Sequence, residues 1–321
     1  MKAKVTVVAT GGTIASMAER GEQRLKAADL AAHISRSPKI ADVTWRDFLS
    51  VPSSRLSTGD VLQLVEVAEE EVQLGATGVV ITHGTDVLEE TAFLLSLFWS
   101  CAEPVILTGA MRPAGSVGAD GPRNLTAAIA TAASPSSRGR GPLVVFNDEI
   151  HAASGVAKMH SWAVDTFTSE HGPVGTVNQR NDVRYHRRTE MRETLPRPSS
   201  LDEPVALITA GMSSQAAVID ALVAGGFRAV VVEAAGLGSL PPDLHRGLER
   251  AVREGMIAVI ASRCAFGGTV AGPSSAGIIR AGSLSGIKAR LKLMAGLSLY
   301  GDDRKALGDL FAKGESDDGG R

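Results

Sequence analysis

The chain has 321 residues, of which 44% are hydrophobic, 21% charged and only 4% aromatic, with a formal net charge of −2. Its length exceeds one ordinary hydrophobic core and predicts two domains. Its composition is typical of a globular α/β protein and excludes a fibrous or broadly disordered one. Because no dense run of Lys and Arg occurs, a nucleic-acid surface is disfavoured and a small-molecule partner is expected.

The sequence favours a cytoplasmic protein without a membrane segment. A first apolar strand begins within a few residues of Met1, which leaves no room for a secretory signal peptide. No stretch of about 20 uninterrupted apolar residues occurs, so a membrane span is not expected. The two cysteines, Cys101 and Cys264, are too few for a disulfide framework or a four-cysteine zinc site. One bridge between them stays open, but reduced thiols are the simpler interpretation.

In the first 150 residues, strand-like apolar runs alternate with helical patterns. Strands are expected at 5–9, 78–82, 105–108 and 143–146. Helical segments are expected around 27–35, at 58–74 with Ser57 or Thr58 as the cap, at 86–99 with Asp86 at the positive end, and at 122–133. Such strict alternation indicates βαβ units and therefore a parallel sheet.

The segment from Arg180 to Pro204 is rich in Arg, Thr, Ser and Pro, lacks a sustained apolar period, and predicts a surface linker. Beyond it the alternation resumes, with strands expected at 205–209, 229–232 and 257–260 and helices at 216–223, 241–254 and 287–297. The predicted architecture is α/β. It comprises a larger N-terminal parallel-sheet catalytic domain (1–185), a linker (186–203), a smaller C-terminal α/β domain (204–313) and a disordered tail (314–321).

Two glycine-rich loops carry threonines directly after predicted strands. The first, residues 10–15, contains Thr13 behind Gly12. Taken alone, Thr13 is better explained as a cap of the following helix. Loops that leave neighbouring strands of a parallel sheet converge, however, and glycine lets a ligand approach the backbone. Together the loops predict a small polar pocket for nucleophilic chemistry.

The second loop, residues 82–86, combines a hydroxyl and a carboxylate, because Gly84 is followed by Thr85 and Asp86. A threonine hydroxyl is a poor nucleophile until a base shares its proton, and a lysine kept neutral by burial or poised by hydrogen bonds is a suitable base. Lys158 follows the strand expected at 143–146 and is the candidate, although its spacing alone is more typical of a surface lysine.

Four strings, in family order, resemble those of the bacterial-type L-asparaginases of the asparaginase/glutaminase family. They are ATGGTIA at 9–15, ITHGTD at 81–86 with EETA at 89–92, GAMRP at 109–113 and ADGPRNL at 119–125. The resemblance covers nearly the whole chain. It implies hydrolysis of the side-chain amide of L-asparagine, with L-glutamine as a possible second substrate, to the acid and ammonia through an acyl-enzyme ester. It implies no metal and no cofactor.

The resemblance also implies roles for single residues. Thr13 corresponds to the family's first-loop nucleophile. In the second set, Thr85 positions or activates the water or nucleophile, Lys158 tunes the hydroxyl, and Asp86 holds the substrate α-ammonium. Ser53 corresponds to the serine that binds the α-carboxylate, with Ser54 as the alternative if the alignment shifts by one residue.

Backbone N–H groups of the turns at Gly12 and Gly84 are expected to donate to the oxyanion of a tetrahedral intermediate. His83 is expected to shape the second loop through hydrogen bonds. His151 and His160 lack a metal-ligand spacing and are expected to be ordinary polar residues. No intact nucleotide-binding glycine loop follows a strand, so nucleotide binding is disfavoured.

The chain departs from the family in three places. Its tyrosines are Tyr185 and Tyr300, so the expected lid tyrosine is absent from 15–30. The segment 267–276 contains no Asp or Glu to match the acidic residue of a neighbouring subunit, and Ser239 replaces the usual amide or histidine. Either the nucleophile is activated by another group, such as the lysine with the second-loop threonine, or turnover is weaker than in typical members.

Assembly into a homodimer or homotetramer is implied by the resemblance. Two other functions stay open. One is a related amidase, either a glutaminase or the amidase subunit of a tRNA-dependent amidotransferase, although the latter normally carries an additional N-terminal domain ahead of the first threonine loop. The other is a binding or sensor protein that holds an amino acid without efficient turnover, which the absent lid tyrosine would permit.

Overall fold

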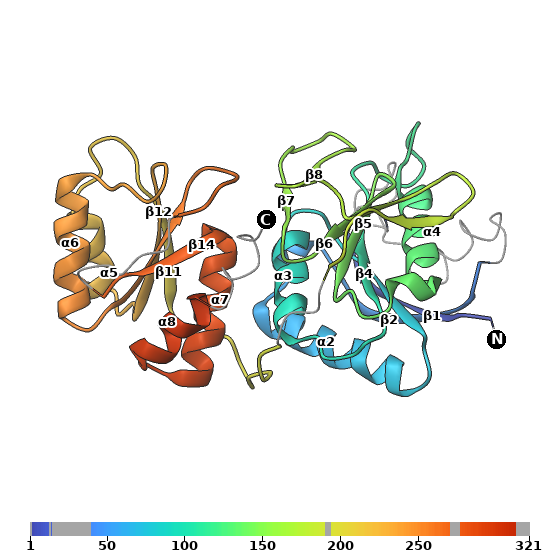
Figure 1. Ribbon diagram of the computed structural model, residues 1–321, viewed down its shortest axis with the longest axis horizontal. Helices are drawn as coiled ribbons and strands as arrows, with labels where there is room; N and C mark the ends of the chain where they lie inside the picture. The colour runs from blue at the N-terminus through green and yellow to red at the C-terminus, as the bar shows by residue number, and fades with distance from the viewer. Residues whose placement is uncertain (1, 13, 15–39, 190–193, 270–276, 313–321) are drawn as a thin grey trace. The chain divides into compact units, whose positions relative to one another are not determined.

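The computed structural model describes residues 2–12, 14, 40–189, 194–269 and 277–312, and the chain divides into two compact units, Met1–Arg197 and Pro198–Arg321 (Figure 1). The boundary between the units falls inside the segment 186–203 that the sequence predicts as a linker. The helical segment expected around 27–35 and the expected tail at 314–321 lie outside the described residues.

The first unit contains an eight-stranded sheet in the order β10-β9-β6-β5-β4-β3-β1-β2. Its parallel part consists of β1 (Lys4–Gly11), β2 (Asp42–Val51), β3 (Gly78–Thr82), β4 (Val105–Thr108) and β5 (Leu143–Phe146). Its antiparallel part consists of β6 (Glu149–Ala152), β9 (Gly175–Val177) and β10 (Val183–Tyr185). The predicted parallel sheet is confirmed for β1, β3, β4 and β5, whereas β2 and the antiparallel extension were not predicted.

A two-residue turn explains why the sheet changes direction after β5. Asn147 and Asp148 both have positive φ, 48° and 66°, the conformation that a tight hairpin turn requires. Arg123 donates from Nε to Asp148 Oδ1 at 2.6 Å and fixes this turn from α4 (Gly121–Ala133). The chain reverses immediately, so β6 runs antiparallel to β5. Two further short strands, β7 (Val156–Lys158) and β8 (Phe167–Ser169), form a separate two-stranded sheet.

The helices of the first unit follow the predicted ones closely. The structure has α2 (Thr58–Gln73), α3 (Leu88–Phe98) and α4, together with the short 3-10 helices η2 (Ser53–Arg55) and η3 (Pro135–Ser137). Ser57 caps α2, because its Oγ accepts the Asp60 N–H at 3.1 Å while Asp60 accepts the Ser57 N–H at 2.7 Å. Since α3 begins at Leu88, Asp86 lies in the turn before the helix and not on it.

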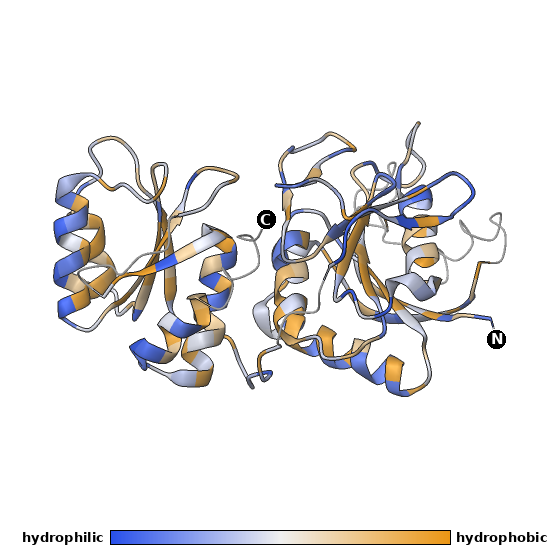
Figure 2. Ribbon diagram, in the orientation of Figure 1, coloured by the Kyte–Doolittle hydropathy of each residue, from blue (hydrophilic) through white to orange (hydrophobic). Residues whose placement is uncertain are grey.

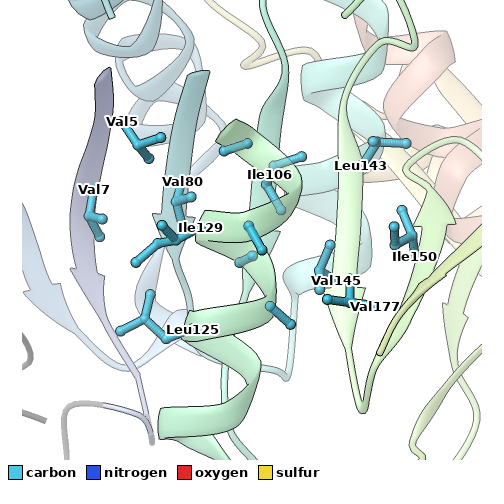
Figure 3. Close-up of a cluster of buried hydrophobic side chains, with 14 of the residues drawn as sticks. Val5, Val7, Val80, Ile106, Leu125, Ile129, Leu143, Val145, Ile150 and Val177 are labelled. Atoms are coloured by element: carbon cyan, nitrogen blue, oxygen red, sulfur yellow. The ribbon is translucent and has the colours of Figure 1, made fainter. Parts of the chain in front are cut away.

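The core of the first unit lies between α4 and the central strands. Figure 3 shows Leu125 and Ile129 of α4 against Val80, Ile106 and Val145 of the sheet, and all five side chains are buried. Burying a side chain of this kind contributes about 1.5–3 kcal/mol. Figure 2 shows that the central strands are hydrophobic and that the helices have one hydrophilic side.

The second unit is the predicted smaller α/β domain. Its four-stranded parallel sheet has the order β11 (Val205–Thr209), β12 (Ala229–Ala234), β13 (Ile257–Ser262) and β14 (Ile279–Ser285). The helices are α5 (Ala217–Ala224), α6 (Pro242–Arg253), α7 (Gly286–Tyr300) and α8 (Arg304–Ala312). The core packs α6, through Leu244 and Leu248, against Val230 and Val232 of β12. Neither β14 nor α8 was predicted.

The prediction of a linker over Arg180 to Pro204 is wrong at its start. Val183–Tyr185 forms β10, the last strand of the large sheet. The Tyr185 hydroxyl lies 2.7 Å from Ser137 Oγ, and the Arg140 guanidinium lies 3.7 Å from the centre of the tyrosine ring. These contacts hold an edge strand of three residues that is too short to give an apolar period.

Two further expectations from the sequence can be compared with the structure. Cys101 and Cys264 are both free thiols. Among the helices of the described residues, none is long and apolar enough to cross a membrane.

Candidate active site

The loops that follow β1, β3 and β2 meet at the carboxyl edge of the large sheet, because β1 lies between β3 and β2. Ala9 of β1 is in register with Thr82 of β3, so the two threonine loops leave neighbouring strands at the same level. Thr10 Oγ1 donates to the Thr82 carbonyl oxygen at 2.8 Å and joins the loops at their origin. The predicted convergence is therefore correct, although Thr13 itself lies outside the described residues.

Glycines allow these loops to pack on one another. A Cβ on Gly12 would lie 2.5 Å from the backbone nitrogen of Gly84, and Gly12 also has a φ of +87°. A Cβ on Gly84 would lie 2.6 Å from Ser53 Oγ in η2. Real Cβ atoms essentially never come that close, so each position needs glycine. The first loop thus lies on the second, and the second lies on Ser53.

Lys158 reaches this edge from β7. Its Nζ donates to Thr85 Oγ1 at 3.0 Å and to Asp86 Oδ1 at 3.0 Å. Thr85 is buried and the lysine side chain is 15% exposed, whereas the Asp86 side chain is 68% exposed. Three of the four expected catalytic residues are therefore brought together, with a carboxylate that also faces solvent. An ammonium beside a buried hydroxyl can donate a proton there.

Packing distinguishes the two candidate serines. Ser53 is only 3% exposed and lies against Gly84 of the second threonine loop. Ser54, the next residue of η2, is exposed. Of the two hydroxyls, the one at Ser53 is therefore the one that contacts the threonine loops.

His83 shapes the second loop, as expected. Its Nδ1 lies 2.6 Å from the Gly84 carbonyl oxygen and its Nε2 lies 3.0 Å from Thr91 Oγ1 on α3. Because a carbonyl oxygen only accepts, Nδ1 carries the proton and Nε2 accepts from Thr91. Complete burial lowers the pKa of His83 from 6.5 to about 4, so the ring is neutral at pH 7.

The segments 109–113 and 119–125, the third and fourth family strings, hydrogen-bond to each other next to the second threonine loop. The Asp120 carboxylate accepts the backbone N–H groups of Met111 and Arg112, each at 2.9 Å. Asn124 Nδ2 donates to the Gly109 carbonyl oxygen at 3.1 Å. A Cβ at Gly109 would lie 2.5 Å from the His83 carbonyl oxygen. The strings therefore hold the loop after β4 against the second threonine loop.

The other histidines have local polar roles, as expected. His151 is buried, and its Nδ1 lies 3.0 Å from Ser169 Oγ, while burial lowers its pKa from 6.5 to about 4. His160 Nδ1 accepts the backbone N–H groups of Trp162 and Ala163 at 3.2 and 3.0 Å. Within the described ranges, no group of three or more His, Cys, Asp or Glu side chains is placed to hold a metal ion.

Several expected features lie elsewhere. The segment 15–30, where the lid tyrosine is absent, and residues 270–276 are outside the described residues. Ser239 lies in the second unit, where it closes a loop by donating its backbone N–H to the Ala235 carbonyl oxygen at 2.8 Å.

One contact in the first unit was not predicted from the sequence: Glu89 Oε2 accepts the backbone N–H of Lys158 at 2.5 Å. Only the EETA string pointed to that glutamate.

The sequence matches the family model of the asparaginase N-terminal domain over residues 4–191 and that of the glutaminase/asparaginase C-terminal domain over residues 204–311. L-asparaginase 2 of Bacillus subtilis is 33% identical over 321 residues, covering 94% of this chain and 84% of the relative. The glutaminase-asparaginase of Pseudomonas fluorescens biotype A is 32% identical over 283 residues, covering 84% and 77%.

Among solved structures, the chain is similar to the crystal structure of a probable cytoplasmic L-asparaginase from Campylobacter jejuni, with a TM-score of 0.89 and 30% sequence identity. The match covers 97% of this chain and 99% of that one. The similarity therefore extends over both units and is not confined to the threonine loops.

Proposed function

This chain belongs to the asparaginase/glutaminase family, and from that premise we propose that it hydrolyses the side-chain amide of L-asparagine to L-aspartate and ammonia. One observation carries the proposal: Lys158 Nζ lies 3.0 Å from both Thr85 Oγ1 and Asp86 Oδ1, beside the glycine turn of the second loop. A buried hydroxyl, an ammonium and an exposed carboxylate in one place suit hydrolysis of a substrate that itself carries a charged amino group.

The carboxylate and the serine bind the amino-acid end of the substrate. Asp86 is exposed enough to accept the substrate α-ammonium while its Oδ1 stays bonded to Lys158. Ser53 supplies a hydroxyl donor to the α-carboxylate, and its contact with Gly84 places that donor next to the reacting loop. Of the two serines, we assign this role to Ser53.

In the first chemical step, the Thr13 hydroxyl adds to the amide carbon and its proton moves to the leaving nitrogen, so that the C–N bond breaks and ammonia departs. Backbone N–H groups of the turns at Gly12 and Gly84 donate to the oxyanion that forms. A water then adds to the ester carbon, the ester bond to Thr13 breaks, and one water proton returns to the threonine oxygen. Thr85 orients that water, and the Lys158 ammonium donates to the Thr85 hydroxyl while the proton moves.

Glutaminase activity is the second candidate, because one relative that matches 84% of this chain is named a glutaminase-asparaginase. L-glutamine is longer by one methylene, and a pocket discriminates one methylene by about 1–3 kcal/mol. Measuring kcat/KM for both amides under the same conditions decides which substrate the site prefers.

Location and assembly are part of the same proposal. We place the chain in the cytoplasm, in line with the structural neighbour that is described as a probable cytoplasmic enzyme. A homodimer or homotetramer remains the expected assembly, and light scattering on the purified protein measures it directly.

The experiment that tests the proposed function is ammonia release from L-asparagine by the purified protein, together with calorimetric titration of L-aspartate. We expect release by the native chain and loss of release in Thr13→Ala. Binding of L-aspartate without any ammonia release would indicate an amino-acid sensor instead. A Thr13→Ala protein with native activity would contradict the acyl-enzyme route.

A further inference from the structure

We propose that Glu89 is a positioning residue for Lys158: its carboxylate fixes the backbone of Lys158 so that the ammonium reaches Thr85 and Asp86. The inference rests on the proposed function, since it gives Lys158 a part in the chemical step. In this proposal Glu89 acts through the backbone of Lys158.

The lysine is held at both of its ends. Its backbone N–H donates to Glu89 Oε2 at 2.5 Å, and its Nζ donates to Thr85 and Asp86 at 3.0 Å each. A hydrogen bond to an ionised carboxylate is shorter and roughly twice as strong as one between neutral groups. Asp86 and Glu89 are only three residues apart, so one turn of the chain provides both anchoring carboxylates.

The topology explains why such an anchor is needed. The strand that carries Lys158, β7, is three residues long and pairs with β8 in a two-stranded sheet. The second threonine loop, in contrast, follows β3, an interior strand of the eight-stranded sheet. Backbone pairing therefore does not transmit the position of the large sheet to Lys158. Side chains of β8 contact the large sheet, where Phe167 packs on Phe146 and Ser169 lies 3.0 Å from His151 Nδ1. The contact from Glu89 acts on the Lys158 backbone itself, across 69 residues of sequence.

Glu89 is itself well placed to act as a fixed point. It lies in the first turn of α3, where the helix dipole stabilises a negative side chain. The preceding residue, Leu88, is fully buried and anchors this turn in the core. A lysine side chain has four rotatable bonds, so an unfixed backbone would let the ammonium leave Thr85 while the substrate-binding groups stay in place.

Three substitutions test the proposal. Glu89→Ala removes the acceptor, Glu89→Gln keeps an uncharged acceptor of the same length, and Glu66→Ala removes an exposed glutamate of α2 as the control. A misplacement of about 1 Å can lower a rate by about 100-fold. We expect a loss of that order in kcat for Glu89→Ala with KM for L-asparagine within about threefold, and recovery to within about tenfold of native kcat in Glu89→Gln. The control should be native.

A second measurement does not depend on turnover. Hydrogen exchange of the Lys158 backbone amide, followed by NMR, reports the proposed bond directly. We expect exchange to be at least about tenfold faster in Glu89→Ala than in the native protein, and close to native in Glu89→Gln. If Glu89→Ala does not fold, Glu89→Asp replaces it, because it retracts the carboxylate by one methylene and should also speed exchange and lower kcat.

The outcomes separate this inference from the proposed function. Native kcat and native Lys158 exchange in a folded Glu89→Ala or Glu89→Asp protein would overturn it, as would a folded Glu89→Gln that loses as much activity as Glu89→Ala. If the native chain released no ammonia but exchange at Lys158 still depended on Glu89, the anchoring would stand and the proposed reaction would fall.

Discussion

Lys158 and Thr85 are 73 residues apart in the sequence, yet Lys158 Nζ lies 3.0 Å from Thr85 Oγ1. Lys158 comes from a short strand outside the large sheet, and Thr85 comes from the loop after β3, an interior strand of that sheet. The pair is partly buried, so water competes only weakly with its hydrogen bond. This contact is the centre of the proposed mechanism.

Removing the Thr85 hydroxyl should abolish most of the activity without unfolding the protein. In Thr85→Val the shape is kept but the partner of Lys158 Nζ is lost, and we expect kcat to fall by about 10²–10⁴. Thr85→Ser retains a hydroxyl and should keep most of the rate. Steady-state kinetics with L-asparagine measure both variants, and thermal unfolding shows that both are folded. A native rate in Thr85→Val would rule out a catalytic role for this hydroxyl.

The adjacent serines provide a matched pair. Ser53→Ala removes the buried hydroxyl beside Gly84, whereas Ser54→Ala removes an exposed one. A hydrogen bond to a charged group contributes about 1.5–3 kcal/mol, so Ser53→Ala should raise KM by about tenfold or more. Ser54→Ala should leave KM within about twofold. The opposite pattern would assign the carboxylate contact to Ser54.

Gly84→Ala should damage both the fold and the site. The new Cβ would lie 2.6 Å from Ser53 Oγ and 2.8 Å from Ser53 Cβ, so either η2 or the loop must move. Overpacking of this kind costs about 1–3 kcal/mol. Gly59→Ala is the control, because its Cβ would meet only Ser57 Oγ at 3.6 Å and alanine favours the helix. Urea unfolding compares the two. Equal stability in both would contradict the close packing at Gly84.

His83 makes stability depend on pH. Its folded pKa of about 4 lies below the ordinary 6.5, so between these values the unfolded chain binds a proton that the folded chain does not. The neutral His83 therefore contributes its full share to the free energy of unfolding above pH 6.5. This contribution decreases as the pH falls from 6.5 to about 4, and at pH 4 it is lower by up to about 3 kcal/mol.

His83→Asn, which keeps a donor for the Gly84 carbonyl, isolates this effect. His151 also has a lowered pKa and titrates in both proteins, so its contribution cancels in the comparison. The free energy of unfolding in urea at pH 7 and pH 4.5 should decrease less in His83→Asn than in the native chain. Equal decreases would show that His83 is not the group responsible.

The sequence predicted the buried strands best. Three of them, 78–82, 105–108 and 143–146, are continuous apolar runs and begin and end where expected. The strand β2 was missed because Asp42, Arg46 and Asp47 interrupt it at the half-exposed edge of the sheet. The strands β6 to β10 were missed because three or four residues are too few for a period.

The chemical groups of the candidate site could be predicted from the sequence, but their packing contacts could not. A hydroxyl, a carboxylate and a lysine can be named from the sequence, and the structure brings Thr85, Asp86 and Lys158 together. The choice between Ser53 and Ser54 depended on which one packs against Gly84, which alternation of residues does not encode. The contact of Glu89 with the backbone of Lys158 has no residue-type signature at the lysine, so only the fold reveals it.

Lys158→Met shows whether hydrolysis needs the lysine ammonium, because methionine fills the space of the unbranched chain and removes the group that bridges Thr85 and Asp86. The measurement is the rate of ammonia release from L-asparagine at saturating substrate by the purified native and variant proteins. We expect steady release by the native chain and a decrease of about 10²-fold or more in folded Lys158→Met. Native turnover in Lys158→Met would show that the ammonium has no part in the reaction.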